Sequence, residues 1–418
     1  MADDYEQYPT YTRFKDPEHV ARAQRAIEDG RYGLDVQEIW WRDHQQFLES
    51  RGYLLRPRFR PGWVPSWKGT DIIPMYCEDS RRNKHGKTLD ATRTIDGERV
   101  VIKVVPSSSN ELRIARSLTT ADKLQDPRNH CVPILDHFPD AADASKHFMV
   151  MPMLRNFEDP PFVFVSEVLD LVEQILQGIV FIHEHRVAHR DCAYLNLMMD
   201  GRLMYPEGYH FSSPGSSPTL GRPATHFGRS EVPTVKYYFT DFGISSHFPA
   251  ARQTHLVTGK DGQDQDVPEL SRTVPYDPFP VDIFILGNLI KKEFVNNYSN
   301  LEFLSPLTGA MTRRNPKERP TAEEALAHFK TIVAMRPRFS LRWRLRDRRE
   351  KVAVRLFRDL SSASREATQL LKRLLGSPIV LTSLILSGSL SLLAILYGRG
   401  AFLARLRSTF GRALHRSR

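Results

Sequence analysis

The chain has 418 residues and a formal net charge of +10, with 59 Lys and Arg against 49 Asp and Glu. This length exceeds one small domain and suits a two-part domain with appendages. From Arg336 onward, 19 basic residues stand against four acidic ones, about +15, so the first 335 residues carry about −5. The basic part brackets an apolar segment, which favours a membrane surface over nucleic acid as its partner.

The three cysteines, Cys77, Cys131 and Cys192, are scattered singly along the chain. This spacing fits neither a disulfide framework nor a zinc site, so we expect a reducing compartment. The first residues, MADDYEQYPTY, are acidic and polar and contain no apolar stretch that could act as a secretory signal. We therefore expect the chain before its C-terminal segment to stay in the cytosol.

Residues 1–67 predict a helical and aromatic extension. Asp16 opens a helical pattern that Gly30 stops, and a second helical pattern runs over 36–48. Three prolines make 53–67 unsuitable for a regular helix. We expect this stretch to be an extended strap over the next domain; its interleaved arginines and aromatics leave nucleic-acid or peptide binding as the alternative.

A β-branched strand follows at 97–105, GERVVIKVV, with a single cation, Lys103, inside it. A charge in an otherwise apolar strand needs either a partner or a solvent-facing edge. Glu111 lies eight residues further on and begins the helical run ELRIARSL. Glu111 is our candidate to pair with Lys103, a choice that rests on the family resemblance given below, and an edge-strand lysine that faces water is the alternative.

Farther along, FMVMPML at 148–154 predicts a buried strand, and apolar residues at helical spacing predict a helix over 166–184. That helix leads into VAHRDCAYLNLMMD at 187–200. A stretch rich in Gly, Pro and Ser, at about 201–234, then predicts a solvated, poorly ordered loop. The next strand ends in an Asp-Phe-Gly tripeptide that starts at Asp241.

The loop at 187–200 carries the residue types that phosphoryl transfer needs. Asp191 supplies a carboxylate that can accept the proton of an attacking hydroxyl group. Asn196, five residues later, supplies an amide oxygen that can hold a metal ion. Asp241 adds a carboxylate, a hard oxygen ligand of the kind that Mg²⁺ prefers.

These strings resemble the motifs of the eukaryotic protein kinases. HRDCAYLN, which ends at Asn196, matches H-R-D-x-x-x-x-N; VVIK, which ends at Lys103, is similar to V-A-I-K; and the tripeptide at Asp241 matches D-F-G. The resemblance covers about residues 68–335 and is greatest to a kinase-like group common in fungi. It implies ATP and Mg²⁺ as cofactors. The implied roles are catalytic for Asp191, Lys103, Glu111 and Arg190, nucleotide-binding for Lys103, Gly86, Met151 and Met153, and metal-binding for Asn196 and Asp241.

Three later residues separate the protein kinases from small-molecule phosphotransferases that share the Asp/Asn loop. Glu269 ends VPE, which resembles the kinase A-P-E, and Arg319 is its expected partner. Asp282 resembles the acid that begins the D-x-W-S-L-G helix. The resemblance thus implies a protein hydroxyl as acceptor, with serine or threonine expected. It also implies that Arg190 meets a phosphorylated activation segment, for which Thr254 and Thr258 are candidates.

Two departures from the family pattern keep a pseudokinase scaffold as the alternative. In the glycine-rich loop, Gly86 fits the third glycine, but Arg81 and Asn83 hold the first two positions. In the catalytic loop, Ala193 and Leu195 stand where Ser/Thr and Tyr kinases respectively place a cation. A cation near the transferred phosphoryl group stabilises its transition state, so its absence from this loop predicts slower transfer.

The C-terminal part predicts membrane attachment. Residues 336–376 alternate arginine with apolar residues, as in a basic amphipathic segment on anionic lipid headgroups. Pro378–Tyr397 is twenty residues without a charge, long enough to span about 30 Å of hydrocarbon, and a buried core helix is its alternative. We expect a single-pass C-terminal anchor, in the mitochondrial outer membrane or the endoplasmic reticulum, with the kinase domain facing the cytosol.

The predicted fold class is α+β: a bilobal protein-kinase-like fold plus one C-terminal transmembrane helix. The expected function is ATP-dependent transfer of the γ-phosphoryl group to a protein substrate, and no nucleic-acid partner is expected. The expected segments are the extension (1–67), a small β-rich N-lobe (68–154), a larger helical C-lobe (155–335, with the loop at 201–234), a basic juxtamembrane segment (336–376), the transmembrane helix (377–398) and a basic tail (399–418).

Overall fold

The computed structural model describes residues 8–83, 86–251, 254–360 and 362. Contacts divide the chain into two compact units, Met1–Arg348 and Arg349–Arg418. Within the described residues, no helix has both the length and the apolar content needed to cross a bilayer. The predicted transmembrane helix at 377–398 and the tail beyond it lie outside the described residues.

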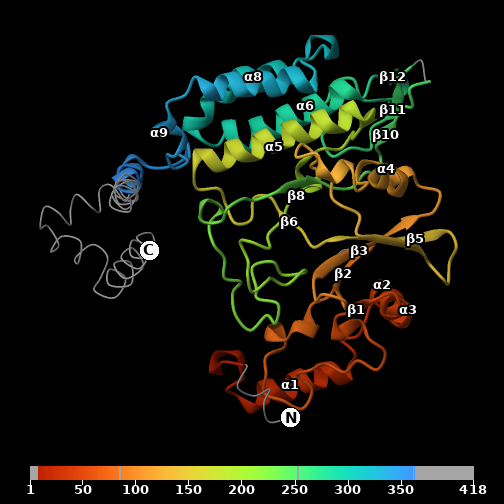
Figure 1. Ribbon diagram of the computed structural model, residues 1–418. Coiled ribbons are helices and arrows are strands. Elements are labelled where there is room, and N and C mark those ends of the chain that lie inside the picture. The colour runs from red at the N-terminus through yellow and green to blue at the C-terminus, as the bar shows by residue number, and fades with distance from the viewer. Residues whose placement is uncertain (1–7, 84–85, 252–253, 361, 363–418) are drawn as a thin grey trace, which may run out of the picture. The chain divides into compact units, whose positions relative to one another are not determined.

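The first unit combines a curled antiparallel sheet with a group of helices (Figure 1), which confirms the mixed helix-and-strand architecture. The large sheet has the strand order β1-β2-β3-β5-β4. Its strands are β1 (Tyr53–Leu55), β2 (Thr88–Arg93), β3 (Arg99–Pro106), β4 (Asp136–Pro139) and β5 (Lys146–Pro152). The shorter strands are β6 (Arg155–Asn156), β7 (Val187–Ala188), β8 (Leu197–Met199), β9 (Tyr237–Phe239), β10 (Ser246–His247), β11 (Val257–Gly259) and β12 (Ser271–Tyr276).

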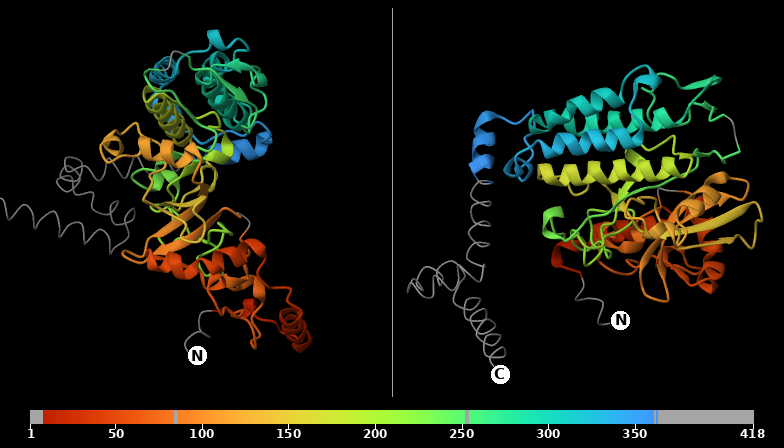
Figure 2. Two further views of the ribbon diagram at one scale, coloured as in Figure 1. Left: turned by 90° about the vertical axis from the view of Figure 1, so that its right-hand side faces the viewer. Right: turned by 45° about the horizontal axis from the view of Figure 1, so that its top comes forward.

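In Figure 1, α5, α6 and α8 lie on one side of this sheet and α1, α2 and α3 lie on the other, and the views in Figure 2 keep that arrangement. The α-helices are α1 (Pro17–Glu28), α2 (Val36–Asp43), α3 (Gln45–Ser50), α4 (Asn110–Leu118), α5 (Val165–Glu184), α6 (Phe279–Leu289), α7 (Ser305–Met311), α8 (Ala322–Ala334) and α9 (Arg338–Leu341). A π-helical segment, η9 (Ile290–Val295), continues α6. The 3₁₀ turns are η2 (Thr10–Thr12), η3 (Pro57–Phe59), η4 (Pro74–Tyr76), η5 (Glu78–Ser80), η6 (Lys123–Gln125), η7 (Tyr194–Asn196), η8 (Arg229–Glu231), η10 (Ser299–Leu304) and η11 (Pro316–Glu318).

The helices of the N-terminal extension begin where the sequence predicts. Asp16 caps α1 by accepting a hydrogen bond from the backbone N–H of Glu18, as N-cap residues do. The pattern at 36–48 forms two helices rather than one, because the chain breaks at His44. There the imidazole Nδ1 lies 2.7 Å from the Trp40 carbonyl and Nε2 lies 3.1 Å from Asp140. The Trp40 carbonyl accepts the His44 N–H at 3.3 Å as well, and that N–H also reaches the Trp41 carbonyl at 3.2 Å, so the last turn of α2 tightens at His44.

One face of the large sheet packs on α2 and α3, so the N-terminal extension completes the core of the sheet. Val100 and Ile102 of β3 are fully buried there, together with Trp41 of α2 and Leu48 of α3. Side chains alternate between the two faces of a strand. Lys103 therefore points to the opposite face of β3.

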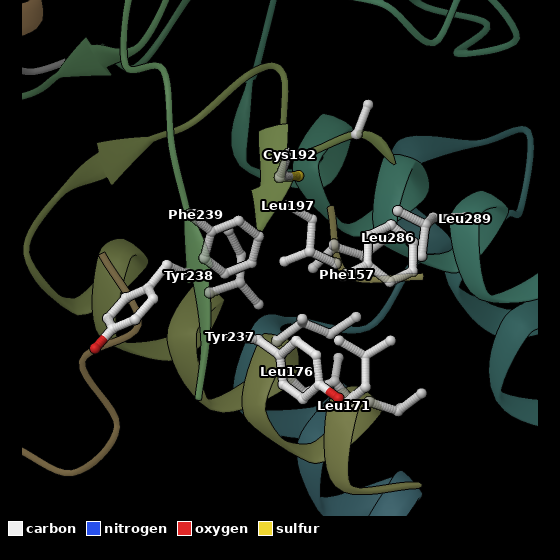
Figure 3. Packing of buried hydrophobic residues seen from close by; sticks show 14 of the residues in the cluster. Phe157, Leu171, Leu176, Cys192, Leu197, Tyr237, Tyr238, Phe239, Leu286 and Leu289 are labelled. Atoms are coloured by element: carbon white, nitrogen blue, oxygen red, sulfur yellow. The ribbon is translucent and has the colours of Figure 1, made fainter. Parts of the chain in front are cut away.

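A second core lies between α5, α6 and the short strands, and Figure 3 shows it from close by. Leu171 and Leu176 of α5 pack near Tyr237 of β9, and Leu286 of α6 closes the same interior. Tyr238, the next residue on β9, points to the other side of the strand (Figure 3). This core fixes α5 and β9, which lead into the loops at 189–196 and 241–243.

The stretch at 201–234 was expected to be solvated and poorly ordered, and that expectation is wrong. Arg229 is buried and donates hydrogen bonds of 2.6 Å to the carbonyls of both Phe157 and Pro160. Arg155 donates to the Pro214 carbonyl at 2.7 Å, and its guanidinium lies over the ring of Tyr205. Backbone carbonyls that lack regular secondary structure are thus satisfied by buried arginines.

The same stretch also binds the sheet side of the molecule. His210 is fully buried, and its Nε2 lies 3.2 Å from both Glu78 and Arg56. Arg56 in turn donates at 2.8 Å to Glu78 and to Asp90 of β2. Residues 201–234 therefore join the sheet to the helical group.

The folded unit does not end at residue 335 as expected. An extended strap at 343–348 adds backbone hydrogen bonds along the helical group: the N–H of Val165 donates to the Trp343 carbonyl at 3.0 Å, and that of Leu345 donates to the Val163 carbonyl at 2.7 Å. Arg348 donates to the Asn297 carbonyl at 2.8 Å. The first part of the predicted juxtamembrane segment thus belongs to the compact unit.

Candidate active site

Asp282 organises the loop that follows β7. It is fully buried in the first turn of α6, and its carboxylate accepts hydrogen bonds from the backbone N–H groups of His189 at 2.8 Å and Arg190 at 2.6 Å. His183 Nε2 lies 2.9 Å from the same carboxylate. These bonds hold Arg190 at a φ of 68°, a left-handed conformation that costs about 1–3 kcal/mol for a residue with a side chain. The left-handed backbone at Arg190 thus sets the direction of the chain at the next residue, Asp191.

The Asp191 carboxylate accepts three hydrogen bonds from two neighbours. Asn196 Nδ2 donates at 2.8 Å, the backbone N–H of Gln263 donates at 2.7 Å, and Gln263 Nε2 donates at 3.2 Å. Burial nonetheless raises the pKa of Asp191 above its ordinary value. A carboxylate with a raised pKa is a stronger base, which suits the acceptance of a proton.

Lys103, Glu111 and Asp241 meet on the face of β3 opposite α2 and α3. The ion pair expected between Lys103 and Glu111 is present, with an Nζ–Oε1 distance of 2.5 Å. Lys103 Nζ also lies 3.0 Å from Asp241 Oδ1. Burial alone would lower the pKa of Lys103, but the charges of Glu111 and Asp241 outweigh it and raise that pKa. The ammonium group therefore stays charged in the buried site, as a phosphate-binding lysine must.

Asn196 and Asp241 are brought together by the end of β9. The backbone N–H of Thr240 donates to the Asn196 carbonyl at 2.9 Å, which places the next residue, Asp241, beside the loop. Asp241 has a φ of 60° and accepts a hydrogen bond from the Gly243 N–H at 3.2 Å.

This pair of oxygen donors fits a Mg²⁺ ion that shares its remaining ligands with phosphate and water. In the described part of the chain, no group of three or more His, Cys, Asp or Glu is arranged to hold a metal by itself. The donor set of Asn196 and Asp241 is consistent with that finding, because Mg²⁺ at phosphate sites is bound by one or two carboxylates and keeps several waters.

Met151 and Met153, two of the residues with an implied nucleotide-binding role, lie on and just after β5, where the chain passes from the sheet to the helical group. Met151 of β5 stands opposite Val101 of β3 and is buried, and Met153 is buried just beyond the strand. The backbone N–H of Met153 donates to the Arg99 carbonyl at 3.3 Å. Contact of these two methionines with a nucleotide stays a prediction.

The segment before β2 has a different setting from the open glycine loop that the resemblance implies. A Cβ atom added to Gly86 would lie 2.4 Å from the Gln37 side chain, and the Gly86 carbonyl accepts a 3.2 Å hydrogen bond from Trp41 Nε1. Asn83 is buried and its N–H donates to Glu38 at 3.0 Å. Gly86 thus lies against the end of the exposed Gln37 side chain of α2, which can move aside, and the contact of Gly86 with phosphate stays a prediction.

Two arginines fix the segment between 241 and 269. Arg190 donates to the carbonyls of Ile244 at 3.0 Å and Thr258 at 2.8 Å, so it reaches the segment in which a phosphorylated threonine was expected. Arg319 binds both carboxylate oxygens of Glu269, at 2.5 and 2.8 Å, as expected. Such a two-point contact is geometrically specific. It anchors the end of the segment against η11.

Gln263 is the site residue that the sequence analysis missed. Its side chain also accepts a 3.1 Å hydrogen bond from the Leu195 N–H, so one glutamine joins the stretch before Glu269 to both the loop backbone and Asp191. A Cβ on the preceding residue, Gly262, would lie 2.9 Å from the Arg190 carbonyl. In the sequence, Gly262 is the signal that the backbone comes close to the Arg190 carbonyl here, because a side chain at this position would collide with it.

The comparisons with known proteins add no relative. No protein-family model and no curated protein matches the chain. What the site can do is therefore argued from its own geometry: a buried lysine paired with two acids, an aspartate of raised pKa, and an asparagine that donates a hydrogen bond to that aspartate.

Proposed function

We propose that this chain is a bilobal, protein-kinase-like phosphotransferase that moves the γ-phosphoryl group of ATP to a protein hydroxyl. The observation that carries the proposal is the contact of Lys103 with both Glu111 and Asp241, next to the Asp191–Asn196 loop. Phosphoryl transfer depends mainly on positioning and on charge stabilisation. This group supplies a cation, a base and two oxygen ligands in one place.

Each residue has a separate task in the proposed reaction. Lys103 binds phosphate oxygens and keeps its charge through Glu111. Asp191 accepts the proton of the acceptor hydroxyl while the new oxygen–phosphorus bond forms and the bond to the leaving diphosphate breaks. Asn196 and Asp241 would hold Mg²⁺, which when bound neutralises charge on the phosphates. Loss of the base removes a group that acts in the transition state, which typically costs a factor of about 10² or more.

A pseudokinase scaffold is the second candidate, favoured by a specific observation. Gln263 occupies the Asp191 carboxylate with two hydrogen bonds, and Gly86 packs on Gln37 instead of standing open. If both contacts persist with nucleotide present, the chain binds ATP without transferring phosphate.

The deciding experiment compares phosphoryl transfer by the wild-type protein and by Asp191→Asn. We expect the full-length protein with Mg²⁺ and labelled ATP to phosphorylate itself or a peptide library, and Asp191→Asn to lose transfer while it keeps nucleotide affinity. Asp122→Asn is the matched control, because it makes the same replacement at an exposed aspartate distant in sequence from Asp191, and it should behave as wild type. Equal silence of wild type and Asp191→Asn with both Mg²⁺ and Mn²⁺ would support the scaffold.

We also propose that the chain is tethered to a membrane through residues 377–398, with residues 336–376 near anionic headgroups where they leave the folded unit. The support is the uncharged run Pro378–Tyr397 between basic flanks. The basic tail and modest hydrophobicity favour the mitochondrial outer membrane over the endoplasmic reticulum. Full-length protein should resist alkaline carbonate extraction and a chain ending at Gly376 should not; release of the full-length protein by high salt would refute the span.

A further inference from the structure

A basic and aromatic stretch closes the first compact unit, from the end of α8 through α9 and the strap at 343–348. Residues 336–348 read RPRFSLRWRLRDR, with six arginines against one aspartate. Met335 and Phe339 are exposed beside these charges, with 72% and 76% of their surfaces accessible. Large apolar side chains in water within a run of positive charge are typical of a segment that contacts the interface of a bilayer.

A hollow of about 530 Å³ lies between this stretch and η10. Its volume is in the range of ligand sites, which run from about 300 to 1,000 Å³. Its wall combines three aromatic rings with polar and charged side chains, namely Phe303, Phe339 and Trp343 with Ser299, Asn300, Glu302, Arg336, Ser340 and Arg346. Such a wall suits a ligand that has both an anionic and an apolar part.

The arginines that line the hollow lie against its aromatic rings. The guanidinium carbon of Arg336 is 4.5 Å from the centre of the Phe303 ring, and that of Arg346 is 5.7 Å from the centre of the Trp343 ring. Arg336 is exposed, so its ring contact leaves the edge of the guanidinium group open to the oxygens of a ligand. A planar fork of N–H donors matches the geometry of a phosphate.

The backbone around the hollow is fixed by hydrogen bonds between η10 and the strap. The N–H of Ser299 donates to the Arg346 carbonyl at 2.9 Å, and the N–H of Arg346 donates to Asn300 Oδ1 at 2.9 Å. The acid among the lining residues, Glu302, lies 3.5 Å from Arg348, which offsets its charge. The hollow is therefore already formed without a ligand, and binding has little ordering cost to overcome.

The position of the hollow in the chain indicates which anion it meets. The first compact unit ends at Arg348, so the chain leaves this unit here on its way to the proposed span at 377–398. Anionic headgroups are the charged groups at the surface of a bilayer, and aromatic side chains settle at the same depth. In Figure 1, α9 lies at the end of the helical group opposite to β11 and β12.

We propose that this hollow binds the phosphate of an anionic phospholipid, with the phosphate on Arg336, the charge of Arg346 beside it, and Met335 and Phe339 in the adjoining acyl layer. A soluble phosphate would leave both apolar side chains in water, which is why the partner is a lipid surface. The inference rests on the proposed membrane tether and extends it, because it specifies the face of the folded unit that lies on the bilayer. The end that carries β11 and β12 then points away from the lipid.

The contact with lipid is measured in the full-length protein in vesicles, with an environment-sensitive fluorophore on Met335→Cys. The native cysteines, Cys77, Cys131 and Cys192, are buried, so the label attaches at 335. We expect a blue shift of its emission in vesicles that contain phosphatidylserine and no shift in phosphatidylcholine alone. Ile95→Cys is the matched control, because Ile95 is an 87% exposed apolar residue in the turn between β2 and β3, and its label should stay in water.

The headgroup contact is measured by titration of the full-length protein in detergent with dihexanoylphosphatidylserine, a soluble short-chain lipid. Arg336→Gln should weaken its affinity about fivefold, the factor expected for one basic residue at an anionic lipid surface. Phe339→Ser should also weaken it, through the acyl chains. Both residues are exposed, so these replacements should leave the fold intact. Arg25→Gln is the matched control, because Arg25 is exposed on α1 and its replacement changes the net charge equally.

Equal emission at residue 335 in both kinds of vesicle would overturn the proposal. So would unchanged affinity in both Arg336→Gln and Phe339→Ser, or equally tight binding of glycerophosphoserine, which has the headgroup without acyl chains. The titration needs no membrane span, so it decides the headgroup contact even if the tether fails. Failure of the tether is seen separately, as release of the full-length protein from vesicles by alkaline carbonate.

Discussion

Gln263 donates to both oxygens of the Asp191 carboxylate, through its backbone N–H at 2.7 Å and its side-chain amide at 3.2 Å. The two residues lie 72 positions apart in the chain. An acceptor hydroxyl that is to lose its proton to Asp191 needs one of the same oxygen lone pairs. The contact therefore sets both the basicity of Asp191 and the access of a substrate to it.

Replacement of Gln263 by alanine should change the pH dependence of transfer. Hydrogen bonds to an ionised carboxylate lower its pKa, so loss of the side-chain donor should raise the pKa of Asp191 further. The base is active only when deprotonated, and the acid limb of the kcat/KM profile should move to higher pH. Gln125→Ala, which removes an exposed glutamine elsewhere, should leave the profile unchanged. An unshifted acid limb in Gln263→Ala would mean that Asp191 is not the titrating base.

Replacement of Lys103 by methionine should destabilise the protein as well as remove a phosphate contact. It leaves Glu111, which is 5% exposed, buried without its partner, and such a loss typically costs about 3–5 kcal/mol. The double variant Lys103→Met/Glu111→Leu should recover much of that stability. Lys330→Met, which breaks an exposed ion pair with Glu173, should cost less than about 1 kcal/mol. Urea denaturation of the wild type and the three variants measures the free energies of unfolding. Equal losses of stability in Lys103→Met and Lys330→Met would contradict the account of a buried ion pair.

Arg229→Ala should show that residues 201–234 are part of the folded unit. It leaves the carbonyls of Phe157 and Pro160 without their donor, at a cost of about 1–3 kcal/mol for each buried group. Arg222→Ala is the matched control in the same stretch, because Arg222 pairs with Glu207 at the surface. We expect Arg229→Ala to lower the denaturation midpoint and to speed proteolysis within 201–234. Rapid cleavage of the wild type in this stretch would favour the solvated loop.

His130 should make the protein sensitive to mild acid. Its Nδ1 lies 2.8 Å from the Tyr237 carbonyl, and burial lowers its pKa from 6.5 to about 4. The unfolded chain therefore binds a proton more readily than the folded one between these values, so stability falls as the pH drops from 6.5 toward 4. His130→Asn keeps a donor for the carbonyl and should flatten this dependence. His19→Asn, at an exposed histidine, should not. The check is the free energy of unfolding at pH 7 and at pH 5.

Local chemistry made several features predictable from sequence. Asp16 before Pro17 marks a helix start because a short acid caps free N–H groups, and α1 begins there. The need of Lys103 for a partner was predictable because a buried charge requires one, while the choice of Glu111 followed from the resemblance. The pairing of Arg319 with Glu269 followed from the resemblance instead.

Long-range packing explains what the sequence did not reveal. A segment rich in Gly, Pro and Ser has few apolar side chains of its own, so composition predicts that it stays solvated. Its order comes from Arg155, which contacts it from outside, and from Arg229, whose acceptors lie about 70 residues earlier. Likewise, Gly262 signals a close approach of the backbone, but it does not indicate that the amide of Gln263 reaches Asp191. Such contacts appear only once the chain has folded.

If the proposed anchor at 377–398 is correct, the strap at 343–348 also limits the distance between the loop at Asp191 and a bilayer. Because the first compact unit ends at Arg348, the sequence has roughly 28 residues, 349–376, between this unit and the proposed anchor. At about 3.4 Å per extended residue its contour is roughly 95 Å, and at about 1.5 Å per residue in a helix it is roughly 42 Å. If both the proposed transfer activity and the proposed anchor hold, the acceptors must lie within roughly 42–95 Å of the membrane, so substrate choice would depend on location as well as on sequence.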